Sequence, residues 1–349
     1  MKIKESLLEL FESNKGIFLS GENIAKNLGC SRTAVWKAVK ALQSDGYSID
    51  AVPNKGYLLS AETDILSSQG IRKYLSPLCR SRLEITVLPS VNSTNAYLQE
   101  NIGSGIKDGY TVLAHRQTNG KGRIGRSFFS PPDTGVYMSL LLRPENYSAE
   151  QAMQITTIAS VAACEAIETV SEHTASIKWV NDVYIGKKKV SGILTEASFA
   201  LENKLLDYAI LGIGFNAYPP EEGFPSELDD IVCSVFEKRV ADGKNRLAAA
   251  FLNCFMKYYT AQNHEDYIEK YRKRSLVLGK SIFVYKRGLP ATAKAIEVSG
   301  GSDVSMGLPA RALDIDNHGG LIVRYEDGSI ETLSTGEISI RLQTAHPVV

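Results

Sequence analysis

Apolar residues in the first sixty positions recur at helical spacing and predict three short helices. The apolar stripes fall within Ile3–Phe11, Ile24–Leu28 and Ala34–Leu42. Gly29 follows the second stripe, where a helix favours a residue in the left-handed conformation. Ser31 precedes the third stripe and is a natural N-cap. Two helices joined by such a tight turn are typical of a helix-turn-helix.

The pattern then changes to short strands with a turn between them. Tyr47–Val52 and Tyr57–Leu59 flank the turn Pro53–Gly56, which predicts a two-stranded wing. We therefore expect residues 1–62 to form a winged helix-turn-helix, DNA-binding domain.

The third predicted helix is basic on its outer face. No acidic residue lies between Ser31 and Ser44, as expected of a recognition helix that faces phosphates. A protein-interaction domain with a solvated basic face is the alternative. The candidate DNA-contacting residues are Ser31, Arg32, Thr33, Trp36, Lys37 and Lys40.

The rest of the chain divides into a mixed α/β region, residues 63–275, and a region of short strands, residues 276–349. Strands are predicted at Glu84–Leu88, Tyr110–Ala114, Tyr137–Leu142, Ser176–Trp179, Val183–Ile185 and Tyr208–Gly214, and helices at Thr94–Asn101 and Glu150–Val170. The last region has strands at Ser281–Tyr285, Ala310–Ile315 and Gly320–Tyr325 with glycine turns, which favours an SH3-like β-barrel. The predicted fold class is multidomain α+β.

Composition limits the classes of function. Lys plus Arg and Asp plus Glu both total 39 in 349 residues, so an anionic partner must meet a local basic patch. The N-terminus lacks the apolar core of a signal peptide, and Ile155–Val170 contains glutamates and reads as a buried helix. We expect a cytoplasmic protein without a membrane partner. Scattered free thiols are expected of the five cysteines Cys30, Cys79, Cys164, Cys233 and Cys254.

The segment with the clearest chemistry is a basic, glycine-rich loop, Gln117–Arg126. Its glycines alternate with Lys121, Arg123 and Arg126, and no acidic residue lies between Arg116 and Pro132. Glycines allow close backbone approach to a ligand, and the cations can bind carboxylate or phosphate oxygens. The loop thus suits two anions held together, and it matches neither a P-loop nor a dinucleotide-binding fingerprint. A mobile surface loop is the alternative.

Four further segments carry polar groups or glycines. Ser90–Asn95 offers hydroxyls and amides ahead of a helix, although it could serve only as an N-cap. Lys178–Tyr184 places charged and amide groups at a strand end. In Lys189–Glu196, a lysine just before an apolar strand, with Gly192 behind it, could direct a cation into a cleft, and the alternative is an exposed hairpin tip at Lys187–Lys189. Leu211–Asn216 is a strand with glycines, which indicates that another group packs closely on it.

In this order, the motifs STN, Gln117 with GKGRIGR, KWVNDVY, KVSGILTE and GIGFN resemble the biotin protein ligase family. The first domain resembles that of bacterial members that also repress biotin synthesis, and ARALDIDNHGGL and Gly336–Arg341 fit the family's C-terminal barrel. The chain departs from the family at Lys121 (usually Arg), Phe128 (usually Trp) and Val180 (usually Pro). The stretch 286–308 is also longer than the family's.

The resemblance implies roles for individual residues. Arg123, Lys189 and Lys121 would be catalytic. Arg126, Phe128 and Asn216 would bind the nucleotide, and Asp182 could help to hold Mg²⁺. The biotin-binding residues would be Ser93, Thr94, Asn95, Gln117, Lys121, Gly122, Arg123 and Lys189.

The implied reaction joins biotin to ATP, as biotinyl-5′-adenylate, and then transfers biotin to a lysine of a biotin carboxyl carrier domain of acetyl-CoA carboxylase or a related carboxylase. The implied partners also include operator DNA and, when ligand is bound, a second copy of the chain. Two alternatives stay open: a biotin-sensing transcription factor with little ligase activity, and a transferase for lipoate or octanoyl groups on the same fold.

Overall fold

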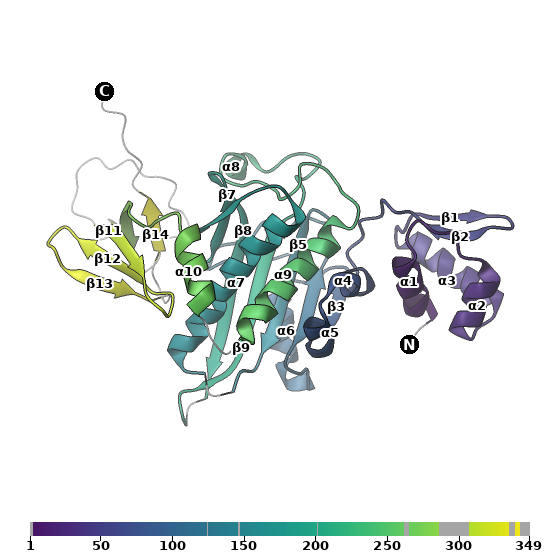
Figure 1. Ribbon diagram of the computed structural model, residues 1–349, viewed down its shortest axis with the longest axis horizontal. Coiled ribbons are helices and arrows are strands. Elements are labelled where there is room, and N and C mark those ends of the chain that lie inside the picture. Colours follow the sequence, from purple (N-terminus) through teal and green to yellow (C-terminus); the bar gives the residue numbers. More distant parts are fainter. Residues whose placement is uncertain are drawn as a thin grey trace.

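Three groups of elements follow one another along the chain and lie in a row in space (Figure 1). The computed structural model describes residues 3–123, 125–145, 147–200, 202–261, 265–285, 307–334 and 339–342. A helical domain with a small hairpin stands at one end, a mixed α/β body in the middle and an antiparallel sheet at the other end. The multidomain α+β fold class is therefore confirmed.

The N-terminal group is a winged helix-turn-helix. Gly29 ends the second helix in the left-handed conformation at φ 60°, and the Ser31 hydroxyl accepts a hydrogen bond from the Ala34 amide over 3.1 Å. Both caps lie where the sequence predicts them. The group has its own apolar core, which includes Leu7, Phe11 and Val35. Its elements are α1 (Ile3–Ser13), α2 (Gly21–Leu28), α3 (Arg32–Ser44), β1 (Ile49–Val52) and β2 (Gly56–Leu59).

A seven-stranded sheet in the order β3-β4-β5-β9-β8-β7-β6 forms the middle group. Strand β3 is parallel to β4, and the other neighbouring strands are antiparallel. The strands are β3 (Glu84–Leu88), β4 (Tyr110–Ala114), β5 (Gly135–Leu142), β6 (Ala175–Lys178), β7 (Asp182–Ile185), β8 (Lys188–Phe199) and β9 (Leu206–Asn216). The helices are α4 (Ser68–Tyr74), α5 (Pro77–Arg82), α6 (Thr94–Asn101), η1 (Ile102–Ser104), α7 (Ala149–Val170), α8 (Ser226–Asp229), α9 (Gly243–Tyr259) and α10 (Glu265–Arg274).

The two faces of this sheet bury different cores. Helices α7 and α9 cover one face and α6 the other (Figure 1). Successive strand residues point to opposite faces, so Val112 and Leu141 pack with Leu98 of α6, whereas Leu113 and Leu140 belong to the large core. Burial on both faces makes the strands almost continuously apolar, and this explains why they were visible in the sequence.

Helices α4, α5, α9 and α10 were not named from the sequence. Strand β8 was also absent from the predicted strands, apart from an apolar stretch expected after Lys189. Its polar residues, among them Lys188, Thr195 and Glu196, interrupt the apolar pattern. The expected hairpin tip does exist, because Gly186 turns the chain between β7 and β8 at φ 58° and Lys187 is exposed. Lys189, two residues further on, instead faces the pocket described below.

The C-terminal group is an antiparallel sheet in the order β13-β12-β11-β10-β14. The strands are β10 (Ser281–Tyr285), β11 (Leu308–Ile315), β12 (Leu321–Tyr325), β13 (Ile330–Leu333) and β14 (Ser339–Leu342). Trp179 Nε1 donates to the carbonyl of Gly319 over 2.9 Å and thereby joins this sheet to the body. The long stretch predicted at 286–308 lies outside the described residues except for its last two positions, and so does the start of the Gly336–Arg341 motif.

Among the described helices, none has the length and apolar character that a membrane span needs. The five cysteines are all free thiols, as the sequence led us to expect.

A buried ionic cluster joins the winged helix to the body. Lys15, at the end of α1, forms an ion pair with Asp242 and donates to the carbonyl of Thr63 over 2.9 Å. Lys73 Nζ and Tyr74 Oη lie 3.2 and 2.6 Å from the same Asp242 carboxylate. Burial opposes ionisation of Asp242, but the hydrogen bonds from Lys15 and Tyr74 outweigh it and lower its pKa.

We expect Asp242→Asn to lower the free energy of unfolding by about 3 kcal/mol at neutral pH, because Lys15 and Lys73 would lose the carboxylate that they share and buried Lys15 would keep only Glu12, at 3.4 Å. Asparagine tolerates the left-handed backbone of this position, φ 54°. Urea unfolding measures the loss. Because folding lowers the pKa of Asp242, its stabilisation is present above the pKa of the unfolded state and is lost as pH falls through the folded value. The difference between wild type and variant should thus shrink in acid.

The matched control is Asp45→Asn, which breaks the exposed Lys4–Asp45 pair. An exposed pair contributes roughly 0–1 kcal/mol. Equal losses for the two variants would contradict the role given to the buried cluster.

Candidate active site

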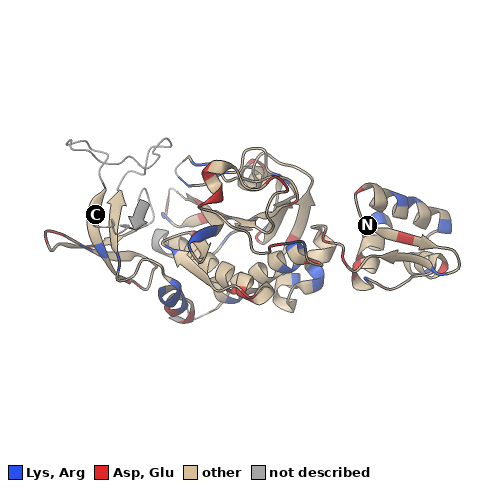
Figure 2. Cartoon of the chain, turned by 90° about the horizontal axis from the view of Figure 1, so that it is seen from above, with Lys and Arg blue, Asp and Glu red and all other residues tan. Residues whose placement is uncertain are grey.

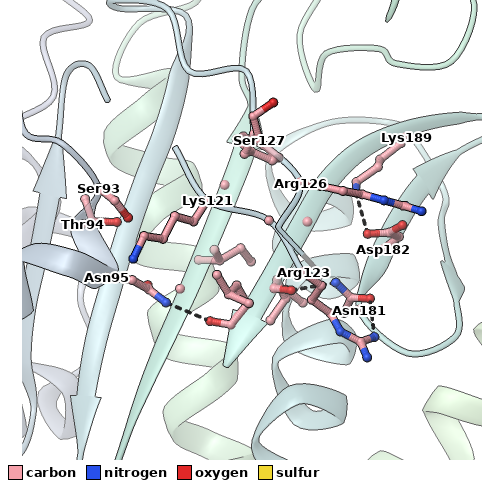
Figure 3. A pocket seen from close by; sticks show the side chains of 18 of the residues that line it. Ser93, Thr94, Asn95, Lys121, Arg123, Arg126, Ser127, Asn181, Asp182 and Lys189 are labelled. Atoms are coloured by element: carbon pink, nitrogen blue, oxygen red, sulfur yellow. Dashed lines mark hydrogen bonds and ion pairs between the residues drawn. The ribbon is translucent and has the colours of Figure 1, made fainter. Parts of the chain in front are cut away.

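A polar pocket opens beside strands β8 and β9, where four segments converge (Figure 3). Ser93 and the first residues of α6 form one side, and the glycine-rich loop forms another. Ser93 occupies the N-cap position of α6, yet its side chain makes no capping hydrogen bond. Its hydroxyl therefore belongs to the pocket lining and not to the helix end.

The end of the pocket beside α6 is built from uncharged polar groups. The Thr94 amide donates to Gln117 Oε1 over 2.8 Å, and Ser139 Oγ lies 2.7 Å from Thr94 Oγ1 and 2.6 Å from Asn95 Oδ1. Asn95 Nδ2 donates to a carboxylate oxygen of Glu196 over 2.6 Å. Each of these side chains lies within hydrogen-bonding distance of the next, in the order Gln117, Thr94, Ser139, Asn95 and Glu196. This end of the pocket therefore has a fixed pattern of donors and acceptors.

The described part of the basic loop is a hydrogen-bonded turn beside this pocket. The Gly122 amide donates to the carbonyl of Arg126 over 2.6 Å, and the Phe128 amide donates to Gly120 over 2.8 Å. A Cβ atom at Gly120 would lie 2.5 Å from the Phe128 carbonyl oxygen. Glycine is needed here because the two arms of the turn approach so closely.

Positive charge dominates the rest of the lining. Lys121, Arg123, Arg126, Lys178 and Lys189 face a single acidic residue, Asp182. That excess of cations favours an anionic ligand with several charged oxygens.

Two of these cations are held in place by neighbours (Figure 3). Lys189 Nζ lies 2.6 Å from Asp182, and Arg123 donates to Asn181 Oδ1 over 3.2 Å. Burial lowers the pKa of the Arg123 guanidinium, and the nearby carboxylate of Asp182 partly opposes that effect. An arginine still carries its charge at neutral pH, so Arg123 is a half-buried, preoriented cation.

Glycines of β9 make room for the side chains that line the pocket. A Cβ atom at Gly212 would lie 2.2 Å from Asn95 Oδ1, and one at Gly214 would lie 2.4 Å from the ring of Phe128. These close approaches explain why glycine occurs at positions 212 and 214 of strand β9.

A second, outer pocket adjoins the first across Phe128 and Lys189. Its walls include the apolar side chains of Pro131, Phe224 and Leu228, and Asn216 also lines it. Asn216 Nδ2 donates to the carbonyl of Cys233 over 3.1 Å. An apolar wall with a few amides suits a flat, partly polar ring.

The structure thus brings all the residues predicted for biotin, nucleotide and metal to these two adjoining pockets. Asp182, however, has no metal-binding partner among the described side chains, where no group of three His, Cys, Asp or Glu residues gathers. Since Mg²⁺ is commonly held by one carboxylate and substrate phosphates, Asp182 fits only as a single ligand beside a nucleotide.

Sequence reasoning missed four lining or supporting residues. Asn181 and Glu196 stand inside motifs that were quoted, but their side chains were not singled out. Ser139 is a buried polar residue in the apolar strand β5, and a serine within an apolar run was the signal that could have identified it. Lys178 lines both pockets.

The six candidate DNA-contacting residues lie together on the exposed face of α3. Each of Ser31, Arg32, Thr33, Trp36, Lys37 and Lys40 is exposed, and Trp36 shows 51% of its surface. Figure 2 shows basic positions on the helices of this domain, at the opposite end of the molecule from the C-terminal sheet.

Comparison with known proteins assigns the family. Bifunctional ligase/repressor BirA of Bacillus subtilis (strain 168) is 33% identical over 341 residues, which cover 97% of this chain and 98% of that protein. The chain belongs to the bifunctional biotin protein ligase family. The Escherichia coli (strain K12) protein of the same name is 28% identical over 93% of this chain and 94% of its own length.

Family descriptions match each part of this ligase-family chain. Residues 4–58 match an HTH domain, residues 87–216 the biotin/lipoate A/B protein ligase family and residues 308–341 the biotin protein ligase C-terminal domain. Among solved structures, a biotin protein ligase from Aquifex aeolicus in complex with biotin and ATP is similar. Its TM-score is 0.58 at 27% identity, over 74% of this chain and 99% of that one.

We expect Gly212→Ala to destabilise this family member by about 2 kcal/mol, because the new methyl group would displace the buried Asn95 amide from its hydrogen bonds. Gly192→Ala is the matched control. A Cβ atom there would meet only the flexible end of Lys189 at 3.2 Å and the Phe128 ring at 3.4 Å, so its effect should stay within about 0.5 kcal/mol. Urea unfolding of both variants measures the difference. Similar stabilities would mean that Asn95 is not held as described.

Proposed function

We propose that this chain forms biotinyl-5′-adenylate from biotin and ATP, transfers biotin to a lysine of a carrier domain, and represses transcription by binding operator DNA. Residues 1–62 would bind DNA, residues 63–275 would carry out catalysis, and residues 276–349 would form the barrel-like C-terminal domain. The observation that carries the proposal is the pocket itself, in which an uncharged polar end adjoins an excess of cations.

The uncharged end suits the ureido ring of biotin, because that ring both donates and accepts hydrogen bonds. Ser93, Thr94, Asn95 and Gln117 supply the polar groups, and all four line the pocket. Biotin's valeryl chain would then lead its carboxylate past Gly122 toward the cations of the basic loop.

The first step needs charge stabilisation and alignment. A carboxylate oxygen of biotin attacks the α-phosphorus of ATP, a new O–P bond forms, and pyrophosphate leaves as the bond to the β-phosphate breaks. Arg123, Lys121 and Lys189 offset the repulsion between the two anions and the charge that develops on the phosphate oxygens. In the second step, the carrier amine attacks the acyl carbon and AMP leaves.

The outer pocket would take the nucleotide. Phe128 offers a face for adenine, Asn216 offers an amide and Arg126 stands between the two pockets to bind phosphate. Asp182 is the candidate protein ligand for Mg²⁺, which would be bound to the ATP phosphates and would supply further neutralisation there.

The proposal also covers the acceptor protein, the form that binds operator DNA and the cellular compartment. The natural acceptor would be the biotin carboxyl carrier domain of acetyl-CoA carboxylase or a related carboxylase. A single winged helix reads a short half-site, so repression calls for a dimer on a two-fold operator. Bound adenylate would neutralise the basic loop and favour that dimer. Five free thiols suit the reducing cytoplasm, where we place the protein.

Arg123→Ala should lower kcat/KM for adenylate formation by roughly 30-fold or more, equivalent to about 2 kcal/mol of transition-state stabilisation. Pyrophosphate release measures the first step, and mass spectrometry of a carrier domain measures transfer. Lys187→Ala is the control, since this exposed lysine follows the Gly186 turn and lines neither pocket. If folded wild type transferred lipoate and not biotin, the substrate assignment would be wrong.

Lys40→Ala should weaken operator binding across sequences and reduce the slope of log affinity against log salt by about 1, if that side chain meets one phosphate. Fluorescence anisotropy on labelled duplexes at several salt concentrations measures both. Lys187→Ala again removes one charge at a distant site and should leave the slope unchanged. A variant of residue 40 with wild-type affinity and slope would remove α3 from the DNA interface.

A further inference from the structure

A chain of four polar side chains runs from Glu196, which does not line the pocket, to Thr94, which does. Glu196 contacts Asn95, Asn95 contacts Ser139, and Ser139 contacts Thr94. Ser139 is fully buried, and Thr94 and Asn95 are 4% and 3% exposed. Because water has little access to these three groups, each hydrogen must go to a partner within the chain or to a ligand.

The carboxylate of Glu196 fixes the first link. A carboxylate only accepts hydrogen bonds, so the atom of Asn95 that faces Glu196 at 2.6 Å must be the amide nitrogen. The same nitrogen donates to the backbone carbonyl of Leu194 over 3.3 Å. Both hydrogens of the Asn95 amide are thus taken, and its oxygen must point toward Ser139.

The next two links follow from the number of hydrogens. Ser139 has one hydroxyl hydrogen, and Asn95 Oδ1 at 2.6 Å can only accept it. Ser139 Oγ also lies 2.7 Å from Thr94 Oγ1, placed as a donor to it. Because its single hydrogen goes to Asn95 Oδ1, which carries none, we assign the hydrogen between the two hydroxyls to Thr94.

Gln117 does not compete effectively for the Thr94 hydroxyl hydrogen. Its Oε1 is 3.2 Å from Thr94 Oγ1 and already accepts the Thr94 backbone amide hydrogen over 2.8 Å. Thr94 therefore directs its hydrogen to Ser139 and presents a lone pair to the pocket.

We propose that Glu196 is a remote specificity-determining residue, which sets the direction of this chain so that Thr94 offers an acceptor, and not a donor, to the ligand. The inference rests on the proposed function, because the matching ligand group is an N–H of biotin's ureido ring. A ring oxygen at the same place would meet a lone pair. Since Glu196 acts through Asn95 and Ser139, it is a positioning residue.

The test compares biotin with its two cyclic carbamate analogues, in each of which one ring N–H is replaced by oxygen. Isothermal titration with the full-length protein gives the affinity for each ligand. Wild type should prefer biotin to one of the analogues by at least roughly tenfold, because a site built to accept an N–H penalises its loss. In Glu196→Ala, the Asn95 amide and the hydroxyls beyond it can reverse, so this preference should fall at least about fivefold.

Two further variants separate specificity from stability. Glu196→Gln keeps an acceptor oxygen for Asn95 and should retain most of the preference. Ser139→Ala frees the Thr94 hydroxyl and should lose the preference even though Glu196 remains. Circular dichroism establishes that each variant is folded before binding is measured.

The possible outcomes separate a failure of the proposed function from a failure of the role given to Glu196. If wild type does not bind biotin, the proposed function itself fails. If wild type binds biotin but Glu196→Ala weakens biotin and both carbamates equally, or leaves all three unchanged, the proposed function stands and the role of Glu196 is wrong.

Discussion

A carboxylate and a phosphate repel each other, and a protein that joins them must offset that repulsion before any bond forms. The inner pocket would do so with its five lining cations, which face one lining carboxylate. The five cations repel one another, so holding them close together costs free energy, and neighbouring groups must fix their positions. Asp182 and Asn181 hold Lys189 and Arg123 in place, so the alignment that the reaction requires exists before ligand arrives.

The sheet supplies the rigid part of the pocket and the loops supply the charge. Gly212 and Gly214 occupy a strand that is buried on both faces, and each provides the space that a side chain from another segment occupies. Backbone hydrogen bonds to two neighbouring strands hold Gly212 and Gly214 in place, so the sheet fixes the spaces that Asn95 and Phe128 fill. In the proposed function, recognition of the neutral ring would thus rest on the sheet, and neutralisation of charge would rest on the loop.

The difference between what the sequence revealed and what it hid has a physical basis. Strands such as β4 and β5 were predictable because an apolar core on each face requires continuous apolar runs. Strand β8 was not, since its pocket-facing positions must be polar, and function there breaks the local pattern. Lys189 was found because a lysine before an apolar strand, with Gly192 behind it, can direct a cation into a cleft, and because the family resemblance implies a role for it. Glu196 and Ser139 instead contact their partners only after folding.

The buried cluster at Asp242 connects the two ends of the proposed function. Asp242 precedes α9 and binds Lys15 of the winged helix, and Lys244, two residues further on, donates to the carbonyl of Asp133 over 3.3 Å. Asp133 directly follows Pro131 and Pro132, which line the outer pocket. The first turn of α9 therefore contacts both the DNA-binding domain and the segment that would enclose a nucleotide. A repressor that reads a two-fold operator needs its recognition helices at a set spacing. A winged helix held by buried ion pairs keeps its orientation on the body, which a flexible connector alone would not provide.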